Sequence, residues 1–539
     1  MAKTTSLTAS TNGNNTTSSS ERAELHKTIW KIANDLRGSV DGWDFKSYVL
    51  GMLFYRFISE NLSGYLNEQE RKAGAPDFDY AELSDEQAEF GRADTVQEKG
   101  FYLLPSELFD NVRKRARNDA NLNETLARVF KNIEGSAIGT DSEADLKGLF
   151  DDLDVNSTKL GGTVAKRNEK LVKLLDAIGE LPLAGGAGAF TRSSIDLFGD
   201  AYEYLMQMYA SSAGKSGGEY YTPQEVSELL ARITVVGKTE VNKVYDPACG
   251  SGSLLLKFVK VLGHDKVRQG FYGQEINLTT YNLCRINMFL HDVNFEKFNI
   301  AHGDTLTDPA HMDDEPFEAI VSNPPYSIKW DGDKNPLLIN DPRFSPAGVL
   351  APKSKADLAF TMHILSWLAV NGTAAIVEFP GVLYRGGAEQ KIRQYLIENN
   401  YVDTVIQLPP DLFFGTTIAT CIIVLKKSKR DNKVLFIDAS AEFERSGNKN
   451  TLTADNQQKI LDAFTSRENI EHFAKLVDQA AIAENGYNIS VSSYVQPPDA
   501  RQVIDIKKLN AEIAEIVKRQ SELRTQIDAI VADLEGGQP

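Results

Sequence analysis

Hydrophobic positions repeat with a helical period through the first third of the chain. Steps of four, three and four residues place four apolar side chains on one helix face, namely Leu25, Ile29, Ile32 and Leu36. The stretch from Tyr48 to Ile58 is dense in aromatic residues and predicts a buried helix. Because few strand-like runs occur before about Lys170, we predict a helical domain over residues 21–180.

From about Val241 the pattern changes. Short apolar runs rich in β-branched residues alternate with longer amphipathic stretches, which predicts a doubly wound α/β sheet over residues 181–495. The candidate strands are Lys243–Tyr245, Phe271–Gln274, Asn299–Ala301, Ala319–Ser322, Ala374–Glu378, Thr404–Leu408 and Cys421–Leu425. The Gly- and Ala-rich stretch Pro182–Ala189 suits a linker before the sheet.

The C-terminal segment has the most regular period of the chain. Alternating steps of four and three residues form a coiled-coil-like a/d seam with one polar member: Leu509, Ile513, Ile516, Gln520, Leu523, Ile527, Ile530 and Leu534. Gly536 and Gly537 end the pattern, so we predict one helix within residues 496–539. This helix either packs on its own domain or contacts a helix of another chain.

Composition narrows the class of protein. Residues 1–20 are mostly Ser, Thr, Asn and Gly, which predicts a disordered tail without the apolar core of a signal peptide. No run of about 18 apolar residues occurs, so we expect no membrane span. The 3 cysteines and 7 histidines form no disulfide or metal-binding pattern, which indicates a cytoplasmic protein that needs no metal.

The net charge complicates any role on nucleic acid. The chain has 58 basic and 75 acidic residues, which gives a formal net charge of −17. Contact with phosphates requires Lys and Arg gathered on one face. Two possibilities remain at this point: an acidic enzyme that never meets nucleic acid, or a catalytic subunit whose DNA affinity comes mainly from a partner.

A glycine-containing motif follows the first predicted strand. Glycines let the backbone approach a ligand closely, and the helix expected over Leu254–Leu262 offers free N–H donors at its N-terminus. A carboxylate at the strand end suits an ammonium or hydroxyl donor. The residues assigned to cofactor binding here are Asp246, Ala248, Gly250, Ser251, Gly252 and Ser253.

Two acidic residues follow the next two predicted strands. Glu275 ends one strand, where a carboxylate suits the two hydroxyls of a ribose. Asp304 follows the strand after it, where an acceptor suits the exocyclic amine of adenine. Glu275 alone is more typical of a solvated strand end, and Asp304 after a glycine is common in turns. We assign both to cofactor binding because of their order along the chain.

A short proline-containing motif follows the candidate strand Ala319–Ser322. Two prolines, Pro324 and Pro325, fix the backbone and its carbonyl groups, Asn323 offers an acceptor oxygen, and Tyr326 offers an aromatic face. A planar amine is held by two acceptors and a stacking surface. We therefore assign these four residues to catalysis, although a proline-rich loop whose tyrosine has no catalytic role would have the same sequence.

An upstream segment completes the set of motifs. Thr222 and Pro223 are predicted as the N-cap and first residue of a helix that runs toward Ile233. The residues assigned to the cofactor in this segment are Glu219, Tyr220, Tyr221, Thr222, Pro223 and Gln224.

Taken in this order, the motifs resemble those of AdoMet-dependent amino-group methyltransferases. Asp246–Ser253 resembles the loop that binds S-adenosyl-L-methionine (AdoMet), and Glu275 resembles the ribose ligand. Asn323–Tyr326 resembles the NPPY signature of adenine-N6 enzymes. Thr222-Pro223 resembles an additional cofactor motif that precedes the loop in one class of these enzymes.

The likeness extends beyond the methylase motifs. Several segments resemble the modification subunit (HsdM) of type I restriction–modification systems, namely Ile29-Trp30, Asp44-Phe45, Phe54–Ile58, Tyr202–Leu205 and Gly217–Pro223. The resemblance runs in order from about Arg22 to Leu534. It implies a site-specific DNA adenine-N6 methyltransferase whose partners are DNA, a specificity subunit, a second modification subunit and a restriction subunit.

The resemblance also implies a mechanism. The target adenine leaves the duplex, Tyr326 stacks on it, and the oxygens of Asn323 and Pro324 accept its N6 hydrogens before an in-line methyl transfer. An NPPY enzyme that modifies RNA or a protein glutamine would carry the same catalytic residues. A non-catalytic AdoMet-binding scaffold is the alternative from another class.

Two segments after the NPPY motif have an open role. The loop over residues 327–355 either contacts DNA or is solvated, and its charges are Lys329, Asp331, Asp333, Lys334, Asp341, Arg343, Lys353 and Lys355. Phe413 and Phe414 either contact the flipped base or pack in the core.

Overall fold

The computed structural model describes residues 24–30, 44–183, 192–212, 221–332, 335–414, 416–447, 449–497 and 506–536. The tail predicted over residues 1–20 and most of the predicted linker lie outside these ranges. The chain divides into two compact units, Met1–Val495 and Gln496–Pro539.

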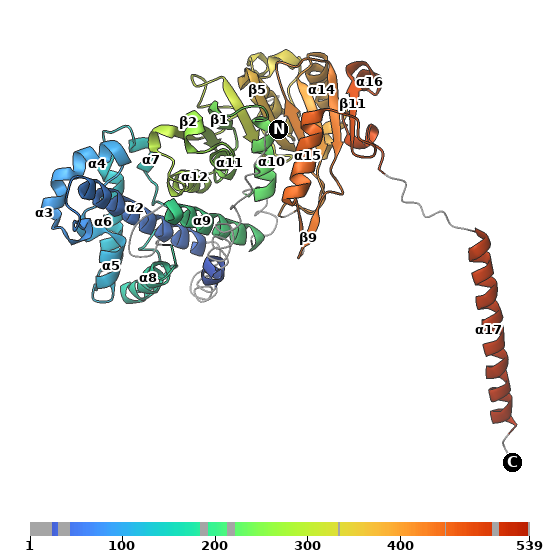
Figure 1. Ribbon diagram of the computed structural model, residues 1–539, viewed down its shortest axis with the longest axis horizontal. Helices are drawn as coiled ribbons and strands as arrows, with labels where there is room; N and C mark the ends of the chain where they lie inside the picture. The colour runs from blue at the N-terminus through green and yellow to red at the C-terminus, as the bar shows by residue number, and fades with distance from the viewer. Residues whose placement is uncertain are drawn as a thin grey trace, which may run out of the picture. The chain divides into compact units, whose positions relative to one another are not determined.

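Helices fill the first part of the larger unit (Figure 1). They are α2 Asp44–Lys72, α3 Asp85–Ala88, α4 Arg92–Lys99, α5 Phe109–Ala116, α6 Leu122–Ser136, α7 Glu143–Leu146, α8 Val164–Gly179 and α9 Arg192–Ser212. The buried helix predicted at Tyr48–Ile58 is confirmed inside α2, where Leu50 and Leu53 are inaccessible to solvent.

A nine-stranded sheet forms the rest of this unit, with the order β11-β8-β6-β7-β5-β4-β1-β2-β3. Its strands are β1 Val241–Asp246, β2 Val267–Glu275, β3 Phe298–His302, β4 Phe317–Ser322, β5 Leu368–Glu378, β6 Val402–Gln407, β7 Cys421–Leu425, β8 Lys433–Asp438 and β11 Ala474–Asp478. A separate hairpin pairs β9 Glu444–Ser446 with β10 Lys449–Thr451. All seven predicted strands are confirmed, and β8 to β11 are additions.

The strand directions locate the site. Strands β3, β2, β1, β4 and β5 are parallel neighbours, whereas β7 runs antiparallel between β5 and β6. The chain order turns back between β1 and β4. In open α/β sheets, ligands bind beyond the carboxyl ends of the strands at such a reversal.

Helices cover both faces of the sheet. Neighbouring residues of a strand point to opposite faces, so each buried strand contributes apolar side chains to both faces. Val377 belongs to one buried cluster and Ile376 to the other. The first cluster contains residues of α10 Gln224–Thr234, α11 Ser253–Leu262, α12 Leu278–Leu290 and α15 Ala454–Ser466. The second contains residues of α13 Asp357–Trp367, α14 Ala388–Glu398 and α16 Gln479–Glu484. The predicted doubly wound α/β fold is therefore confirmed.

The helical region is joined to the sheet through α12. Arg285 on α12 donates through Nη1 to the backbone carbonyls of Ala144 (2.8 Å) and Lys147 (3.0 Å). Phe289 on the same helix lies 6.1 Å from Phe54 of α2, measured between ring centroids. One continuous hydrophobic cluster runs from the N-terminal helices to the sheet.

The smaller unit contains the predicted C-terminal helix, α17 Ile506–Glu535, and none of its side chains is buried. Its apolar seam residues are exposed, with Ile516 at 66% and Leu523 at 52% of full exposure. Within the described ranges, no helix combines the length and apolarity that a membrane crossing requires.

Candidate active site

Asp246 closes β1 beneath the glycine loop. Its side chain is 1% exposed, and Oδ1 accepts hydrogen bonds from the Ala248 amide (3.0 Å) and the Ser322 hydroxyl (2.7 Å). Burial raises the pKa of Asp246 to about 7, against the opposing effect of these two donors. Because Ser322 ends β4, the carboxyl group ties together the two strands between which the chain order reverses.

The glycines of the loop adopt backbone conformations that other residues disfavour. Gly250 and Gly252 have φ angles of 55° and 79°. A Cβ atom on Gly252 would lie 2.8 Å from the sulfur of Cys284, so the loop also packs too closely for a side chain. Helix α11 begins directly afterwards, at Ser253.

The Glu275 carboxylate reaches from β2 to this loop. Oε2 accepts from the Gly250 amide (3.1 Å), and Oε1 accepts from the Asn277 amide (2.8 Å). Burial raises the pKa of Glu275 above its usual range, although these backbone donors oppose the shift. The end of β2 and the glycine loop are thus held together by one side chain.

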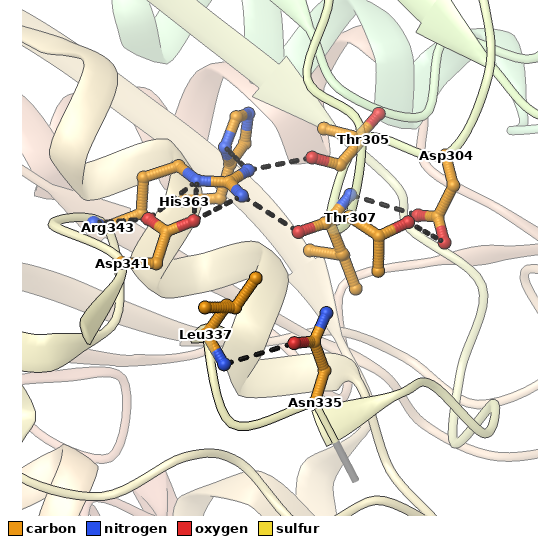
Figure 2. Close-up of polar contacts among 9 residues, drawn as sticks. Asp304, Thr305, Thr307, Asn335, Leu337, Asp341, Arg343 and His363 are labelled. Carbon is orange, nitrogen blue, oxygen red and sulfur yellow. Dashed lines mark hydrogen bonds and ion pairs between the residues drawn. The ribbon is translucent and has the colours of Figure 1, made fainter. Parts of the chain in front are cut away.

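Asp304 lies in the loop after β3, where its carboxylate organises the turn (Figure 2). Oδ1 accepts from the Leu306 amide (3.0 Å) and Oδ2 from the Thr307 hydroxyl (2.9 Å). The Thr305 hydroxyl donates to the carbonyl of Pro247 (2.6 Å), which connects this turn to the glycine loop.

A cavity of about 390 Å³ opens between these loops. Six of the predicted site residues line it: Ala248, Gly250, Glu275, Asp304, Asn323 and Pro325. Other predicted residues stand outside the lining, namely Tyr221, Thr222, Pro223, Gln224, Asp246, Ser251, Gly252, Ser253, Pro324 and Tyr326. The ends of β1, β2, β3 and β4 therefore share one cavity with the proline-containing motif.

The Asn323 amide is fixed in one orientation. Its Nδ2 donates to the Thr222 hydroxyl (3.0 Å), and its Oδ1 accepts from the Tyr326 hydroxyl (2.6 Å). The expectation that Thr222 caps the following helix is wrong, because Pro223 stands at the cap position and α10 begins at Gln224. The Thr222 side chain contacts Asn323 instead.

The backbone after Tyr326 is held from α13. Ser327 has a φ angle of 53°, and its amide donates to Oδ1 of Asp357 (3.0 Å). Burial raises the pKa of Tyr326, and the nearby Glu378 carboxyl group raises it further, so the Tyr326 hydroxyl remains a neutral donor.

The upstream segment is described only in part. Glu219 and Tyr220 lie outside the described residues. Tyr221 is buried and lies 5.8 Å from Phe414 between ring centroids. Phe413 is 1% exposed and packs in the core, and the half-buried Phe414 packs against the same hydrophobic cluster.

The comparisons with known proteins agree on one family. Residues 193–502 match the model described as N-6 DNA Methylase, and residues 25–178 match the HsdM N-terminal domain. The MpnII type I restriction enzyme methylase subunit of Mycoplasma pneumoniae is 50% identical over 95% of this chain and 97% of its own length. The MjaVII methylase subunit of Methanocaldococcus jannaschii is 33% identical over 77% of this chain and 70% of its own length.

A solved structure agrees with these sequence matches. The type I restriction–modification methyltransferase subunit of Streptococcus thermophilus is 37% identical, covers 88% of this chain and 99% of its own, and superimposes with a TM-score of 0.79. The chain belongs to the N-6 DNA methylases of this type. It is a methylase subunit of a type I restriction–modification system, and its activity is N6-adenine methylation of DNA.

Membership of the N-6 DNA methylases decides between the alternatives that the motifs left open. The RNA, protein-glutamine and non-catalytic alternatives do not describe this family. AdoMet is the methyl substrate that the family implies, and the methylase subunit forms part of a type I complex.

Sequence reasoning about the loop after Tyr326 was wrong for one residue. Arg343 of the methylase subunit is neither solvated nor available to DNA, because it is 5% exposed and paired with Asp341 at 2.8 Å. Nothing in the sequence indicated its other partners, the backbone carbonyls of Thr305 and Leu306. Among the described residues, no group of three or more His, Cys, Asp or Glu side chains is arranged to hold a metal ion.

Proposed function

We propose that AdoMet binds in the cavity at the ends of β1, β2, β3 and β4 and that Asn323–Tyr326 directs its methyl group to N6 of an adenine. The observation that carries the proposal is that Asn323 and Pro325 line the same cavity as Gly250 and Glu275. Its volume of about 390 Å³ lies within the roughly 300–1,000 Å³ of small-molecule sites.

The residues around this cavity fit the cofactor. The Glu275 carboxylate suits the two ribose hydroxyls, and the Asp304 carboxylate suits the exocyclic amine of the cofactor's adenine. Gly250 lets the backbone approach the ligand. Asp246 supports the loop from below, since its carboxyl group is buried and bonded to Ala248 and Ser322.

The catalytic step follows from the acceptors around Asn323. A target adenine cannot reach the cavity from inside a duplex, so it flips out. Oδ1 of Asn323 and the carbonyl of Pro324 accept the two N6 hydrogens and orient the nitrogen lone pair. The N–C bond forms as the C–S bond of AdoMet breaks, and one N6 proton leaves to solvent.

Tyr326 serves as the stacking surface for the flipped base. In this structure its hydroxyl donates to Oδ1 of Asn323. An oxygen with two lone pairs accepts two donors, so the incoming N6 amine either shares this atom with the hydroxyl or displaces it.

Target recognition belongs to partners in this proposal. The methylase subunit carries a net charge of −17, and α17 exposes an apolar seam. Both features favour assembly with a specificity subunit that reads DNA, beside a second methylase subunit and a restriction subunit.

The decisive experiment compares Asn323→Ala with Asn242→Ala in the full complex. Asn242 is an exposed asparagine on β1 and serves as the matched control. Asn323→Ala should lower methyl transfer by roughly 10²-fold or more and lower AdoMet affinity, measured by calorimetry, far less than the rate, whereas Asn242→Ala should behave as wild type. Normal methyl transfer by Asn323→Ala would refute the catalytic assignment.

A further inference from the structure

Arg343 connects its own loop to the turn after β3 and to α13 (Figure 2). Its guanidinium donates through Nη1 to the Thr305 carbonyl (2.8 Å) and through Nη2 to the Leu306 carbonyl (2.8 Å). Asp341 accepts from Nε (3.0 Å) and Nη2 (2.8 Å). A buried guanidinium with both a carboxylate partner and two carbonyl partners is a fixed part of the structure.

The His363 imidazole completes the surroundings of Arg343. Nη1 of Arg343 lies 3.2 Å from Nδ1 of His363, and the Tyr245 hydroxyl lies 3.0 Å from Nε2. A guanidinium only donates hydrogen bonds, so Nδ1 is the acceptor and Nε2 carries the proton. Burial, reinforced by the charge of Arg343, keeps the pKa of His363 well below its usual range, so the ring is neutral.

One peptide group connects Arg343 to Asp304. The carbonyl of the Thr305–Leu306 peptide accepts from Arg343, and the N–H of the same peptide donates to Oδ1 of Asp304 (3.0 Å). In a trans peptide the C=O and N–H groups point in opposite directions. By holding the carbonyl, Arg343 therefore fixes the direction of the donor that holds the Asp304 carboxylate.

The same turn forms part of the cofactor cavity. Asp304, Thr305 and Leu306 line one part of it, and Ile328 and Trp330 from the loop after Tyr326 line another. Arg343 belongs to that second loop and does not line the cavity itself. Its hydrogen bonds to Thr305 and Leu306 connect the two parts of the lining.

We propose that Arg343 is a positioning residue that sets the recognition of the cofactor's adenine by Asp304. This inference rests on the proposed contact between Asp304 and the exocyclic amine. Without Arg343 the Thr305–Leu306 peptide loses the donors that hold its carbonyl side, although Thr305 stays bonded to Pro247. The Leu306 amide, one of the two donors that hold the Asp304 carboxylate, is then aimed less firmly. Discrimination between an amine and a carbonyl at the purine 6-position then falls.

The test uses two ligands that differ in the purine 6-substituent and in the hydrogen on the adjacent N1, S-adenosyl-L-homocysteine and S-inosyl-L-homocysteine. Their dissociation constants are measured by calorimetry on the full chain for wild type, Arg343→Gln and Arg393→Gln. Arg393 is the matched control, because it is also buried and donates to two carbonyls, those of Tyr487 and Val382 at 2.8 Å. It does not line the cavity.

Wild type should prefer the adenosyl ligand roughly 10- to 100-fold, the ratio expected for a hydrogen bond to a charged acceptor. Arg343→Gln should reduce this preference to about 3-fold or less, mainly through weaker binding of the adenosyl ligand. Arg393→Gln should keep the wild-type ratio. Equal weakening of both ligands in Arg343→Gln, or an unchanged ratio, would overturn the proposal, because a merely structural residue affects both ligands alike.

A wild type without preference would instead show that Asp304 does not read the amine, and both assignments would fall together. If Arg343→Gln does not fold, Asp341→Asn provides the second variant, since it weakens the grip on the guanidinium and leaves Arg343 in place. Asp341→Asn should give a preference for the adenosyl ligand that is smaller than that of wild type but not abolished. An unchanged preference in a folded Asp341→Asn protein would overturn the proposal.

Discussion

Replacing Thr222 with valine tests whether the orientation of Asn323 limits catalysis. The substitution keeps the shape of a β-branched side chain and removes the acceptor that holds Nδ2 of Asn323. Thr222 is 6% exposed, so water has little access to replace the lost oxygen. Only the Tyr326 hydroxyl then holds the Asn323 amide. The amide rotates more readily, and its nitrogen can face the substrate amine, where two donors oppose each other.

The magnitude follows from the hydrogen bond that is lost. Leaving a buried donor unsatisfied costs about 1–3 kcal/mol. If that cost falls on the productive orientation of Asn323, methyl transfer slows by roughly 5- to 150-fold, since 1.4 kcal/mol corresponds to a factor of about ten. AdoMet affinity should change by less than about 2-fold, because Thr222 does not line the cavity.

The assay combines single-turnover methyl transfer in the assembled complex with calorimetric AdoMet binding to the methylase subunit. Thr222→Ser is the control, because it keeps the hydroxyl group, and it should retain most of the rate. The reasoning is refuted if Thr222→Val keeps the wild-type rate. A rate that falls only together with AdoMet affinity would refute it as well, and would mean that Thr222 contacts the cofactor, as the sequence motif suggested.

Three further outcomes follow from the structure. Because burial raises the pKa of Asp246 to about 7, the Asp246 carboxyl group stays protonated to a higher pH in the folded state than in the unfolded state. The free energy of unfolding of wild type, relative to that of Asp246→Asn, should therefore fall as the pH rises from about 4 to 7. A pH-independent difference between the two proteins in urea unfolding would contradict this. Tyr326→Ala should weaken binding of an extrahelical adenine by about 1–3 kcal/mol, whereas Tyr326→Phe should not, and equal losses in fluorescence titrations would argue against stacking. Ile516→Asp combined with Leu523→Asp on α17 should impair methylation that depends on the specificity subunit while AdoMet binding survives; unchanged co-purification with that subunit would exclude α17 as the contact.

Strands β1 to β7 could be predicted from the sequence because each of them contains a compact apolar run between polar turns. The run Val434–Ile437 within β8 has the same character, so its signal was present and was overlooked. Strand β11, by contrast, contains only Leu476 and Val477 as adjacent aliphatic residues beside Ala474, and it is defined by pairing with β8 rather than by its own pattern.

For the site, the sequence supplied the residues but not their hydrogen-bond partners. Motif order brought Gly250, Glu275, Asp304 and Asn323 to one cavity, because all follow neighbouring parallel strands. One of the two partners of Asn323, Thr222, lies 101 residues away in the chain, and no spacing rule connects these two residues. Arg343 was misjudged for a related reason: two of its acceptors are backbone carbonyls, which every residue carries.

The acidic charge and the exposed C-terminal helix place related demands on the partner. Along the seam of α17, Arg519 occupies a g position and Arg524 the next e position. In a parallel pair of identical helices these two arginines would face each other on both sides of the interface, which disfavours pairing between two copies of this chain. A partner helix with acidic side chains opposite both arginines and a polar residue opposite Gln520 would complement α17 in charge as well as in apolar surface. Under the proposed function, the same partner supplies the basic DNA-reading surface, because the net charge of −17 on the methylase subunit opposes long-range attraction to the duplex.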